Sequence, residues 1–231
     1  FYVNDNTCNN YLLKIWKREL NILTKFILYP IRFLTHLLPG GSIHRIYKPS
    51  QNDRDIFHLF DKQECHLKFT KEEEEIGKSL LLNFGIKQEN EFVCLTVRDS
   101  AYLPNKDALY HNYRDCEIDN YLLAAEEITK RGIYVIRMGA KVNKTFNTNN
   151  PKIIDYATNG MRSEFLDIYL GAKCKFCIST STGWDAIPYI FRKPIIFAPF
   201  TPIALYTIPG LFLSRINPFK ANVSNCSFGT Q

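Results

Sequence analysis

Short apolar runs separated by longer amphipathic stretches characterise the second half of the chain. The apolar runs are typical of buried strands, and the stretches between them repeat every three or four residues, as helices do. The pattern predicts strands at 92–97, 133–136, 152–155, 175–179 and 194–197, and helices at 118–130, 163–170 and 185–191. Because strands and helices alternate, we expect an α/β fold with a Rossmann-type parallel sheet and helices on both faces.

The first part of the chain has a different pattern. Apolar residues recur every three or four positions between Leu12 and Leu38, with basic side chains mostly on the other side. This spacing predicts a basic amphipathic helix that Pro30 kinks or divides. The helix has two interpretations: peripheral contact of 12–38 with an anionic lipid surface, or ordinary packing on a neighbouring domain, which is the commoner case.

Signals for a second helix and a domain boundary follow. Thr70 is a good helix cap, the run Glu72 to Glu75 suits a solvated first turn, and Gly85 suits the C-terminal end. Because the chain begins with Phe1 and not with Met, we expect an incomplete N-terminal domain. The predicted organisation is an N-terminal domain over 1–85, a Rossmann-like domain over 86–215 and a polar tail over 216–231.

Composition and charge narrow the function only slightly. The chain has 231 residues, 45% hydrophobic and 23% charged, which is enough for one large or two small domains. Its net charge of +6 suits acidic ligands, but no Lys/Arg run with interleaved aromatics points to nucleic acid. No apolar run reaches the roughly 20 residues of a membrane-spanning helix.

The cysteines bear on location and on metal chemistry. Seven cysteines at irregular spacing favour reduced thiols and a cytoplasmic protein over a secreted disulfide framework. Cys174 and Cys177 form a Cys-x-x-Cys pair, but both fall in a predicted strand and no second pair accompanies them. We expect them to be structural.

Polar side chains follow nearly every predicted strand, where parallel sheets bind their ligands. The densest group is the hydroxyl run from Ser179 to Thr182, placed where a helix begins and its unpaired N–H groups favour an anion. Two arginines and a lysine at the same edge could neutralise a diphosphate without a metal ion. The residues predicted to bind the ligand at this edge are Arg98, Arg137, Gly139, Lys141, Asp155, Ser179, Thr180, Ser181, Thr182 and Gly183.

Structural alternatives stay open for the charged members of this set. An arginine and an aspartate at a strand end, such as Arg98 and Asp99, can simply form an ion pair. Lys141 is also compatible with an ordinary surface residue. Asp155 could hold a loop instead of binding a ribose hydroxyl.

Five segments taken together resemble a known family. They are VRDSAYLPN at 97–105, HNYRD at 111–115, RGIYVIRMGAK at 131–141, IIDYATNGMRSEFLDIYLGAK at 153–173 and STSTGWDAIPYIF at 179–191. In this order they resemble a family of glycosyltransferases associated with bacterial surface-polysaccharide synthesis, over about Phe92 to Phe200. The Thr182-Gly183 turn, followed by Lys193-Pro194, also resembles the donor-binding region of GT-B enzymes such as the heptosyltransferases.

The resemblance implies a GT-B-like glycosyltransferase that moves a sugar from a nucleotide-sugar donor to a glycan or lipid-linked acceptor of the lipopolysaccharide or capsule type. The anion site would then bind the donor, with no cofactor and no metal. The alternatives are another sugar-nucleotide enzyme, such as an epimerase or a pyruvyl-type transferase, and a non-catalytic nucleotide-sugar-binding module.

Sugar transfer with inversion requires a carboxylate or an imidazole near the acceptor hydroxyl. The candidates on the predicted rim are Asp99, His111 and Asp115, and Asp99 is favoured because it follows Arg98 at a strand end. The loop between them is rich in tyrosine and polar side chains, which suits sugar recognition. By analogy with the acceptor-binding loops of GT-B enzymes, the acceptor-side candidates are Gly40, Gly41 and His44.

Overall fold

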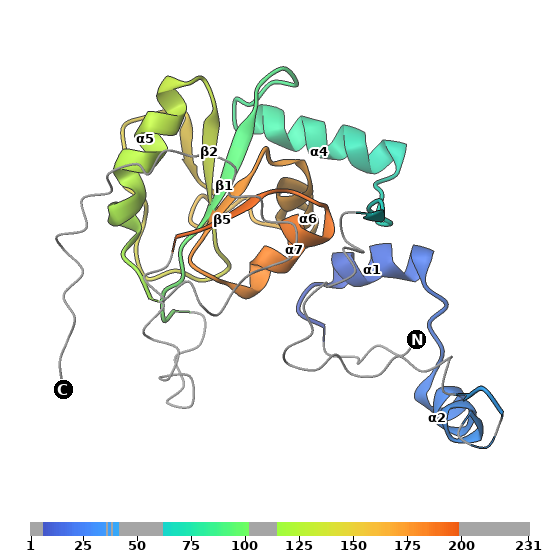
Figure 1. The fold of residues 1–231 in the computed structure, drawn as a ribbon. Coiled ribbons are helices and arrows are strands. Elements are labelled where there is room, and N and C mark those ends of the chain that lie inside the picture. The colour runs from blue at the N-terminus through green and yellow to red at the C-terminus, as the bar shows by residue number, and fades with distance from the viewer. Residues whose placement is uncertain (1–6, 36, 38, 42–61, 102–114, 199–231) are drawn as a thin grey trace, which may run out of the picture.

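The computed structural model describes residues 7–35, 37, 39–41, 62–101 and 115–198 (Figure 1). Its centre is one five-stranded parallel sheet in the spatial order β3-β2-β1-β4-β5. The strands are β1 (Phe92–Thr96), β2 (Tyr134–Met138), β3 (Ile153–Asp155), β4 (Cys177–Ser179) and β5 (Ile195–Phe197). The predicted α/β fold with a parallel sheet is confirmed.

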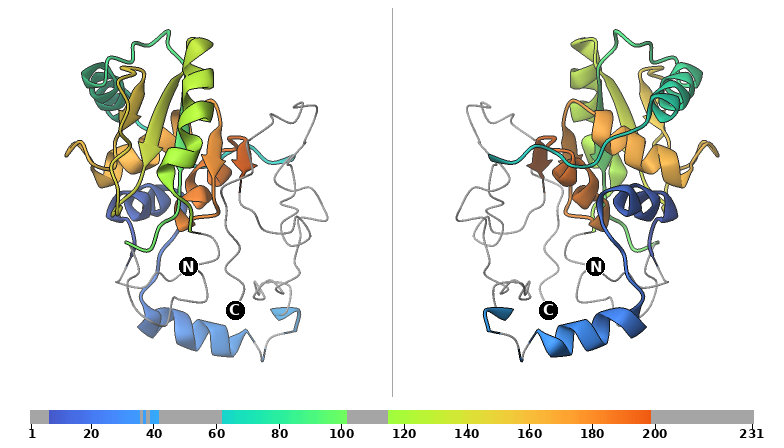
Figure 2. Two further views of the ribbon diagram at one scale, coloured as in Figure 1. Left: turned by 90° about the vertical axis from the view of Figure 1, so that its left-hand side faces the viewer. Right: turned by 90° about the vertical axis from the view of Figure 1, so that its right-hand side faces the viewer.

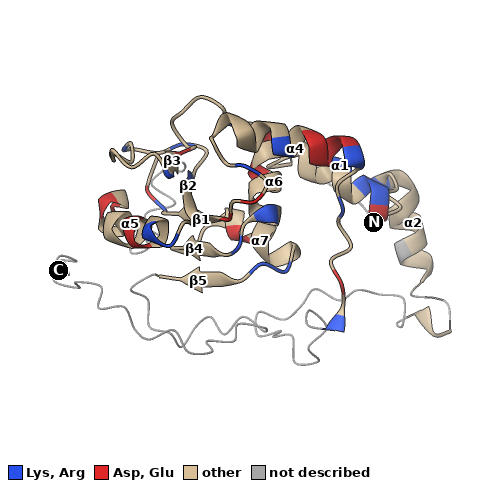
Figure 3. Ribbon diagram, turned by 90° about the horizontal axis from the view of Figure 1, so that it is seen from above, with Lys and Arg blue, Asp and Glu red and all other residues tan. Residues whose placement is uncertain are grey.

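Helices cover both faces of the sheet, as Figure 3 shows from above. The helix α5 (Leu122–Lys130), entered through the 3₁₀ turn η3 (Ile118–Tyr121), packs on Val93, Leu95 and Val135. On the other face, α4 (Lys71–Asn83) and α6 (Glu164–Lys173) pack on a core that includes Phe92, Cys94 and Ile136. Neighbouring strand residues belong to different cores because successive side chains point to opposite faces.

The N-terminal segment packs on the α6 side of the sheet. In α1 (Asn10–Glu19), Ile15 is buried against Leu67, Ile168 of α6 and Ile187 of α7 (Ala186–Ile190). Asn9 caps α1, and its side-chain amide donates to the Glu164 carbonyl over 3.0 Å. Part of the 1–85 segment is therefore attached directly to the sheet domain.

The single helix predicted over 12–38 is in fact two helices. α1 ends at Glu19, and α2 (Lys25–Leu34) begins after Thr24, with Leu20 and Thr24 both in extended backbone. Pro30 lies inside α2, so the prediction that it divides the helix is wrong: the two helices separate at residues 20–24 instead. The contact of α1 with α6 fixes α1 on the sheet domain. The periodic pattern shows which side of a helix is apolar, but it does not show which element that side will contact, so it could not locate the break. None of the helices in the described part of the chain has the length and apolarity that a membrane crossing requires.

A buried carboxylate joins α1 to α4. Thr70 and Glu73 form a capping box at the start of α4, and Gly85 follows its end with a φ of 76°, as the sequence predicted. Glu73 is not solvated, however: its side chain is 10% exposed, and Arg18 donates to both carboxylate oxygens, to Oε2 over 2.8 Å. The hydrogen bonds from Arg18, with a further one from the Thr70 N–H, lower the pKa of Glu73 to about 2.

We expect Glu73→Gln to lower the free energy of unfolding by about 1–3 kcal/mol at neutral pH, because it removes the charge that Arg18 binds. The folded pKa of Glu73 lies below its ordinary value of 4.5, so the stabilisation is present above that pH and is lost as the pH falls towards about 2. Urea unfolding of both proteins at a series of pH values measures this difference.

The matched control is Glu75→Gln, since the Glu75 side chain is 73% exposed and pairs with Lys78 across one helical turn. This variant should unfold like the parent protein. A Glu73→Gln effect that stays constant from neutral to acidic pH would contradict the assignment of the stabilisation to the carboxylate charge.

Candidate functional site

The carboxyl ends of β1 and β4 mark the point at which the chain changes its direction of growth across the sheet. From β1 the chain adds β2 and β3 on one side, and it then returns to add β4 and β5 on the other side. The helices that follow β1 and β4, α5 and α7, therefore lie on opposite faces (Figure 1). Sheets of this kind bind their ligands at such a switch point. The segments that leave the sheet here are 97–101 and 180–183.

The carboxylate of Asp185 connects both strands to the turn 180–183. Asp185 is 8% exposed, and its Oδ1 accepts from the hydroxyls of Ser179, Thr182 and Thr96 over 2.7, 3.1 and 3.3 Å. Its Oδ2 accepts from the Thr182 N–H over 2.8 Å. Burial raises the pKa of Asp185, and the hydrogen bonds oppose part of that rise because they favour the charged form.

The local sequence explains how this turn forms. Thr182 and Asp185 make a capping box around the 3₁₀ turn η4 (Gly183–Asp185). Ser181 has a φ of 67°, a left-handed conformation that is uncommon for residues other than glycine, and its N–H donates to the Ser179 hydroxyl over 3.0 Å. The Thr180 hydroxyl accepts from the Arg98 N–H over 2.7 Å, which joins the ends of β1 and β4.

The turn 179–183, which the sequence predicted to bind the ligand, therefore has a buried part and an exposed part. Ser179 and Thr180 are fully buried, and both the hydroxyl and the N–H of Thr182 bond to Asp185. These three residues shape the turn. Gly183 is exposed, and a Cβ built on it would meet no heavy atom within 4 Å, while Ser181 is partly exposed. A ligand approaching the turn would reach Gly183 and Ser181 first.

Arg98 and Asp115 meet beside this turn. The Arg98 side chain is 12% exposed, and its Nη1 lies 2.9 Å from Asp115 Oδ1. This is the ion-pair alternative that the sequence left open, although with Asp115 as the partner and not Asp99. A guanidinium carries five N–H donors, so the ion pair does not by itself exhaust the binding capacity of Arg98.

Asp99, the favoured base, fastens two loops together. Its Oδ1 accepts from the Ala101 N–H and its Oδ2 from the Asn143 N–H, each over 2.9 Å. The Asn143 amide also donates to the Ser100 hydroxyl over 3.2 Å. Asp99 therefore connects the loop after β1 to the loop after β2, and it remains partly exposed at the sheet edge.

Arg137 and Asp155 form a buried ion pair under the loop after β2. Arg137 is 1% exposed, and its Nη1 lies 3.1 Å from Asp155 Oδ1 and 3.0 Å from the Lys144 carbonyl. The Asp155 carboxylate also accepts from the Thr158 hydroxyl and the Phe146 N–H. The prediction placed Arg137 beyond a strand that ended at residue 136, whereas β2 continues to Met138. The pair therefore holds the loop after β2 and is separate from the turn at the switch point.

The remaining candidates do not add to the switch point. Gly139 allows the loop after β2 to close on itself, because a Cβ there would lie 2.7 Å from Val142 Cγ1. Lys141 is exposed on the same loop, and Gly41 packs on the backbone of Thr35 after α2. Gly40 lies beside Gly41, and His44 and His111 lie outside the described residues.

Sequence reasoning missed Thr96 and Asp185. The spacing Thr182-x-x-Asp185 is that of a capping box, and this signal could have identified Asp185 as a turn-forming residue. The contribution of Thr96 had no comparable signal, since a threonine inside a strand is ordinary.

Two of the cysteines predicted to be structural or buried lie in the sheet, Cys94 in β1 and Cys177 in β4. Burial raises the pKa of the Cys94 and Cys177 thiols, which keeps them protonated and fits a structural role. Within the described ranges, no group of three or more His, Cys, Asp or Glu side chains is placed to hold a metal ion. The expectation of a metal-free site overlooks one Asp-x-Asp triplet, Asp53 to Asp55, which lies outside those ranges. Metal independence therefore stays a prediction.

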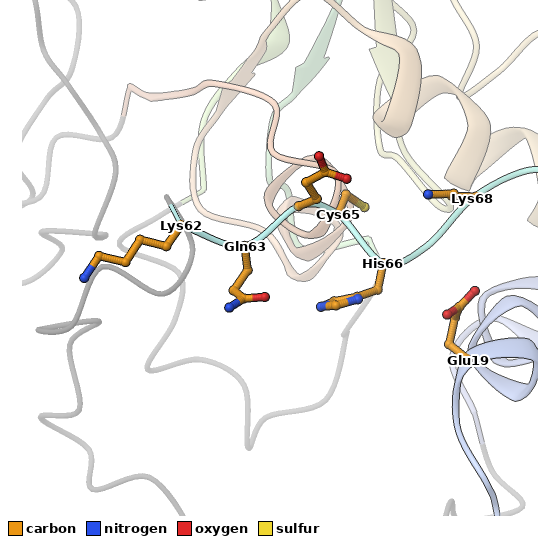
Figure 4. A pocket seen from close by; sticks show the side chains of 7 residues that line it. Glu19, Lys62, Gln63, Cys65, His66 and Lys68 are labelled. Atoms are coloured by element: carbon orange, nitrogen blue, oxygen red, sulfur yellow. The ribbon is translucent and has the colours of Figure 1, made fainter.

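A separate polar cavity of about 390 Å³ lies between the end of α1 and the segment that leads to α4 (Figure 4). Its lining contains none of the predicted site residues: it consists of Glu19, Lys62, Gln63, Glu64, Cys65, His66 and Lys68. The cavity is therefore distinct from the strand ends.

Comparison of the chain with models of known protein families, with curated proteins and with solved structures finds no match.

We expect Asp185→Asn to destabilise the protein by about 1–3 kcal/mol near pH 4, since one oxygen that accepts hydrogen bonds becomes an NH₂ group. Burial raises the folded pKa of Asp185 above its unfolded value. The contribution of this side chain is therefore complete below the ordinary aspartate pKa and declines as the pH rises through the raised one. The stability difference between parent and variant should narrow with rising pH, as urea unfolding would measure.

Asp119→Asn is the control, because the Asp119 side chain is 49% exposed and pairs with Lys144 at the surface. It should give a small and nearly constant difference. A difference for Asp185→Asn that widens with rising pH would mean that the hydrogen bonds to the charged form outweigh burial.

Proposed function

We propose that the chain is a GT-B-like glycosyltransferase that moves a sugar from a nucleotide-sugar donor to a surface-glycan acceptor. The observation that carries this proposal is the hydrogen bond from the Arg98 N–H to the Thr180 hydroxyl, which joins the start of the loop after β1 to the turn after β4 at the switch point. Parallel α/β sheets bind nucleotides at such points, and the resemblance of the same segments to glycosyltransferases supports a sugar nucleotide as the ligand.

The proposed donor site is smaller than the set predicted from the sequence. It consists of the Arg98 guanidinium, the Ser181 side chain and the backbone N–H groups at Gly183 and Trp184. An arginine and backbone N–H groups can bind the oxygens of a diphosphate, and the lack of a side chain at Gly183 allows close approach. Asp185, Thr182 and Thr180 would act indirectly, by holding the turn in place.

In the proposed reaction, the acceptor hydroxyl attacks the anomeric carbon as the bond from that carbon to the diphosphate oxygen breaks. The nucleoside diphosphate leaves with the bonding electron pair, and a base takes the hydroxyl proton. Arg98 and the turn N–H groups would stabilise the charge that develops on the leaving group. Asp99 remains the first candidate for the base, because a carboxylate oxygen that accepts one hydrogen bond can still accept another.

A non-catalytic nucleotide-sugar-binding module is the second candidate function. The observation that favours it is that Asp99 and Asp115 both have structural partners. Such a module would bind the same ligand at the same turn but would transfer no sugar to an acceptor. Binding with no turnover in a screen of nucleotide sugars and glycan acceptors would select this function.

We expect Gly183→Val to weaken the binding of nucleoside diphosphates by at least about tenfold, because the added side chain occupies the open side of the turn. Arg98→Lys should weaken it by about 1–3 kcal/mol through loss of the planar two-pronged geometry. Titration calorimetry with a nucleoside diphosphate and with the matching nucleoside measures both effects, and the nucleoside should bind almost unchanged.

Arg131→Lys is the matched control, since Arg131 lies half exposed directly after α5 and pairs with Glu127. It should leave both affinities unchanged. If Gly183→Val folds normally and binds the diphosphate as the parent does, the turn is not the phosphate site.

We also expect sugar transfer to persist in EDTA, because a guanidinium and backbone N–H groups supply the positive charge that a divalent ion would otherwise bring. The rate would be measured with chelator and after adding back Mg²⁺ or Mn²⁺. A strict requirement for the ion would contradict this prediction and would make Asp53 and Asp55 the first residues to test as ligands.

A further inference from the structure

The helix α2 and its flanks carry most of the exposed large apolar side chains of the described chain. Phe26 is 80% exposed, Leu37 69% and Phe33 68%. Outside this segment, only Ile76, Leu82 and Leu123 are comparable among the described residues. The complete set on this segment is Leu23, Phe26, Ile27, Tyr29, Ile31, Phe33, Leu34 and Leu37.

These side chains form one face of the helix. A period of 3.6 residues places Phe26, Tyr29 and Phe33 along one edge of the apolar arc and Ile27, Ile31 and Leu34 along the other. Lys25 and Thr35 fall on the opposite side of the same helix. The arrangement is that of an amphipathic helix whose apolar face is exposed, and no helix or strand of the described residues covers it.

Charge favours a lipid surface as the occupant of this face. The sequence from Leu20 to Gly41 contains no aspartate or glutamate, but it contains two basic residues, Lys25 and Arg32. Anionic lipids attract such a segment, and aromatic side chains are enriched at the boundary between lipid and water. The Lys25 ammonium lies 5.5 Å from the centre of the Phe26 ring, so this long side chain brings its charge close to an aromatic side chain of the apolar face.

The position of α2 indicates which side of the molecule would face the lipid. Figures 1 and 2 show α2 beyond the carboxyl ends of the strands, apart from the helices that cover the sheet. By contrast, α1 is held to the body through Ile15 and through the ion pair between Arg18 and Glu73. The lipid contact predicted for 12–38 is thereby restricted to the α2 part.

We propose that α2 binds an anionic lipid surface with its apolar face inserted, so that the carboxyl edge of the sheet is turned towards the lipid. The apolar face supplies the affinity, and the basic residues supply the preference for anionic lipid. This inference does not depend on the proposed sugar transfer, since it rests on the exposed side chains and the charge of the segment.

The test is co-sedimentation of the full chain with vesicles of equimolar phosphatidylglycerol and phosphatidylcholine, and with vesicles of phosphatidylcholine alone. The parent protein should bind the anionic vesicles more tightly, and the difference should shrink as salt is added. The double variant Phe26→Glu/Phe33→Glu should lose at least about tenfold in partitioning, because both side chains would be inserted.

Leu82→Glu is the matched control, since Leu82 is 57% exposed on α4 and lies outside the proposed face. It should bind vesicles as the parent does. All three proteins should have the same thermal unfolding and the same affinity for nucleoside diphosphate, which separates a failure of this proposal from a failure of the proposed donor site.

The proposal is overturned if the parent protein does not bind anionic vesicles, or if Leu82→Glu loses as much binding as the double variant. It is also overturned if velocity sedimentation without lipid shows a dimer that the double variant converts to a monomer. In that case a second copy of the chain covers the face.

Discussion

The candidate site depends on the hydrogen bonds that converge on the Asp185 carboxylate. Thr96 reaches it from the end of β1, Ser179 from the end of β4, and Thr182 from the turn between β4 and α7. A carboxylate is costly to bury unless its oxygens are hydrogen bonded, and these donors offset part of that cost. Because they come from three segments, the carboxylate is satisfied only when both strands and the turn are assembled in register. The geometry at Gly183 follows from that assembly.

Glu73 and Asp185 show how the partner decides the state of a buried carboxylate. Arg18 brings a full positive charge to Glu73, and the pKa of Glu73 falls. Asp185 receives hydroxyl and amide dipoles only, and burial raises its pKa. The first carboxylate is therefore fixed in its charged form between two helices. The second is in balance between desolvation and hydrogen bonding, directly beneath the turn that we propose binds an anion.

The two proposals concern the same side of the molecule. The switch point lies at the carboxyl ends of the strands, and α2 lies beyond those ends (Figure 2). A protein held on lipid through α2 would turn Arg98 and Gly183 towards the surface, where a lipid-linked acceptor would be found. Ile15 of α1 packs against Ile168 of α6 and Ile187 of α7, so α1 would anchor the segment that continues into α2.

Local patterns in the sequence predicted the strands and the cap at Thr70, because each depends on neighbouring residues. The alternation of strands and helices along the chain was then enough to predict a parallel sheet. The tertiary structure decided which polar groups are partners. Arg137 pairs with Asp155 18 residues away, Arg18 with Glu73 55 residues away, and Thr96 with Asp185 89 residues away. Periodicity reports which face of an element is apolar, but it cannot report which distant side chain will meet a buried charge. For that reason the sequence predicted Arg137 to bind a ligand, whereas the structure shows it in an ion pair with Asp155. For the same reason Asp185, which bonds to both strands and to the turn, was not among the predicted residues.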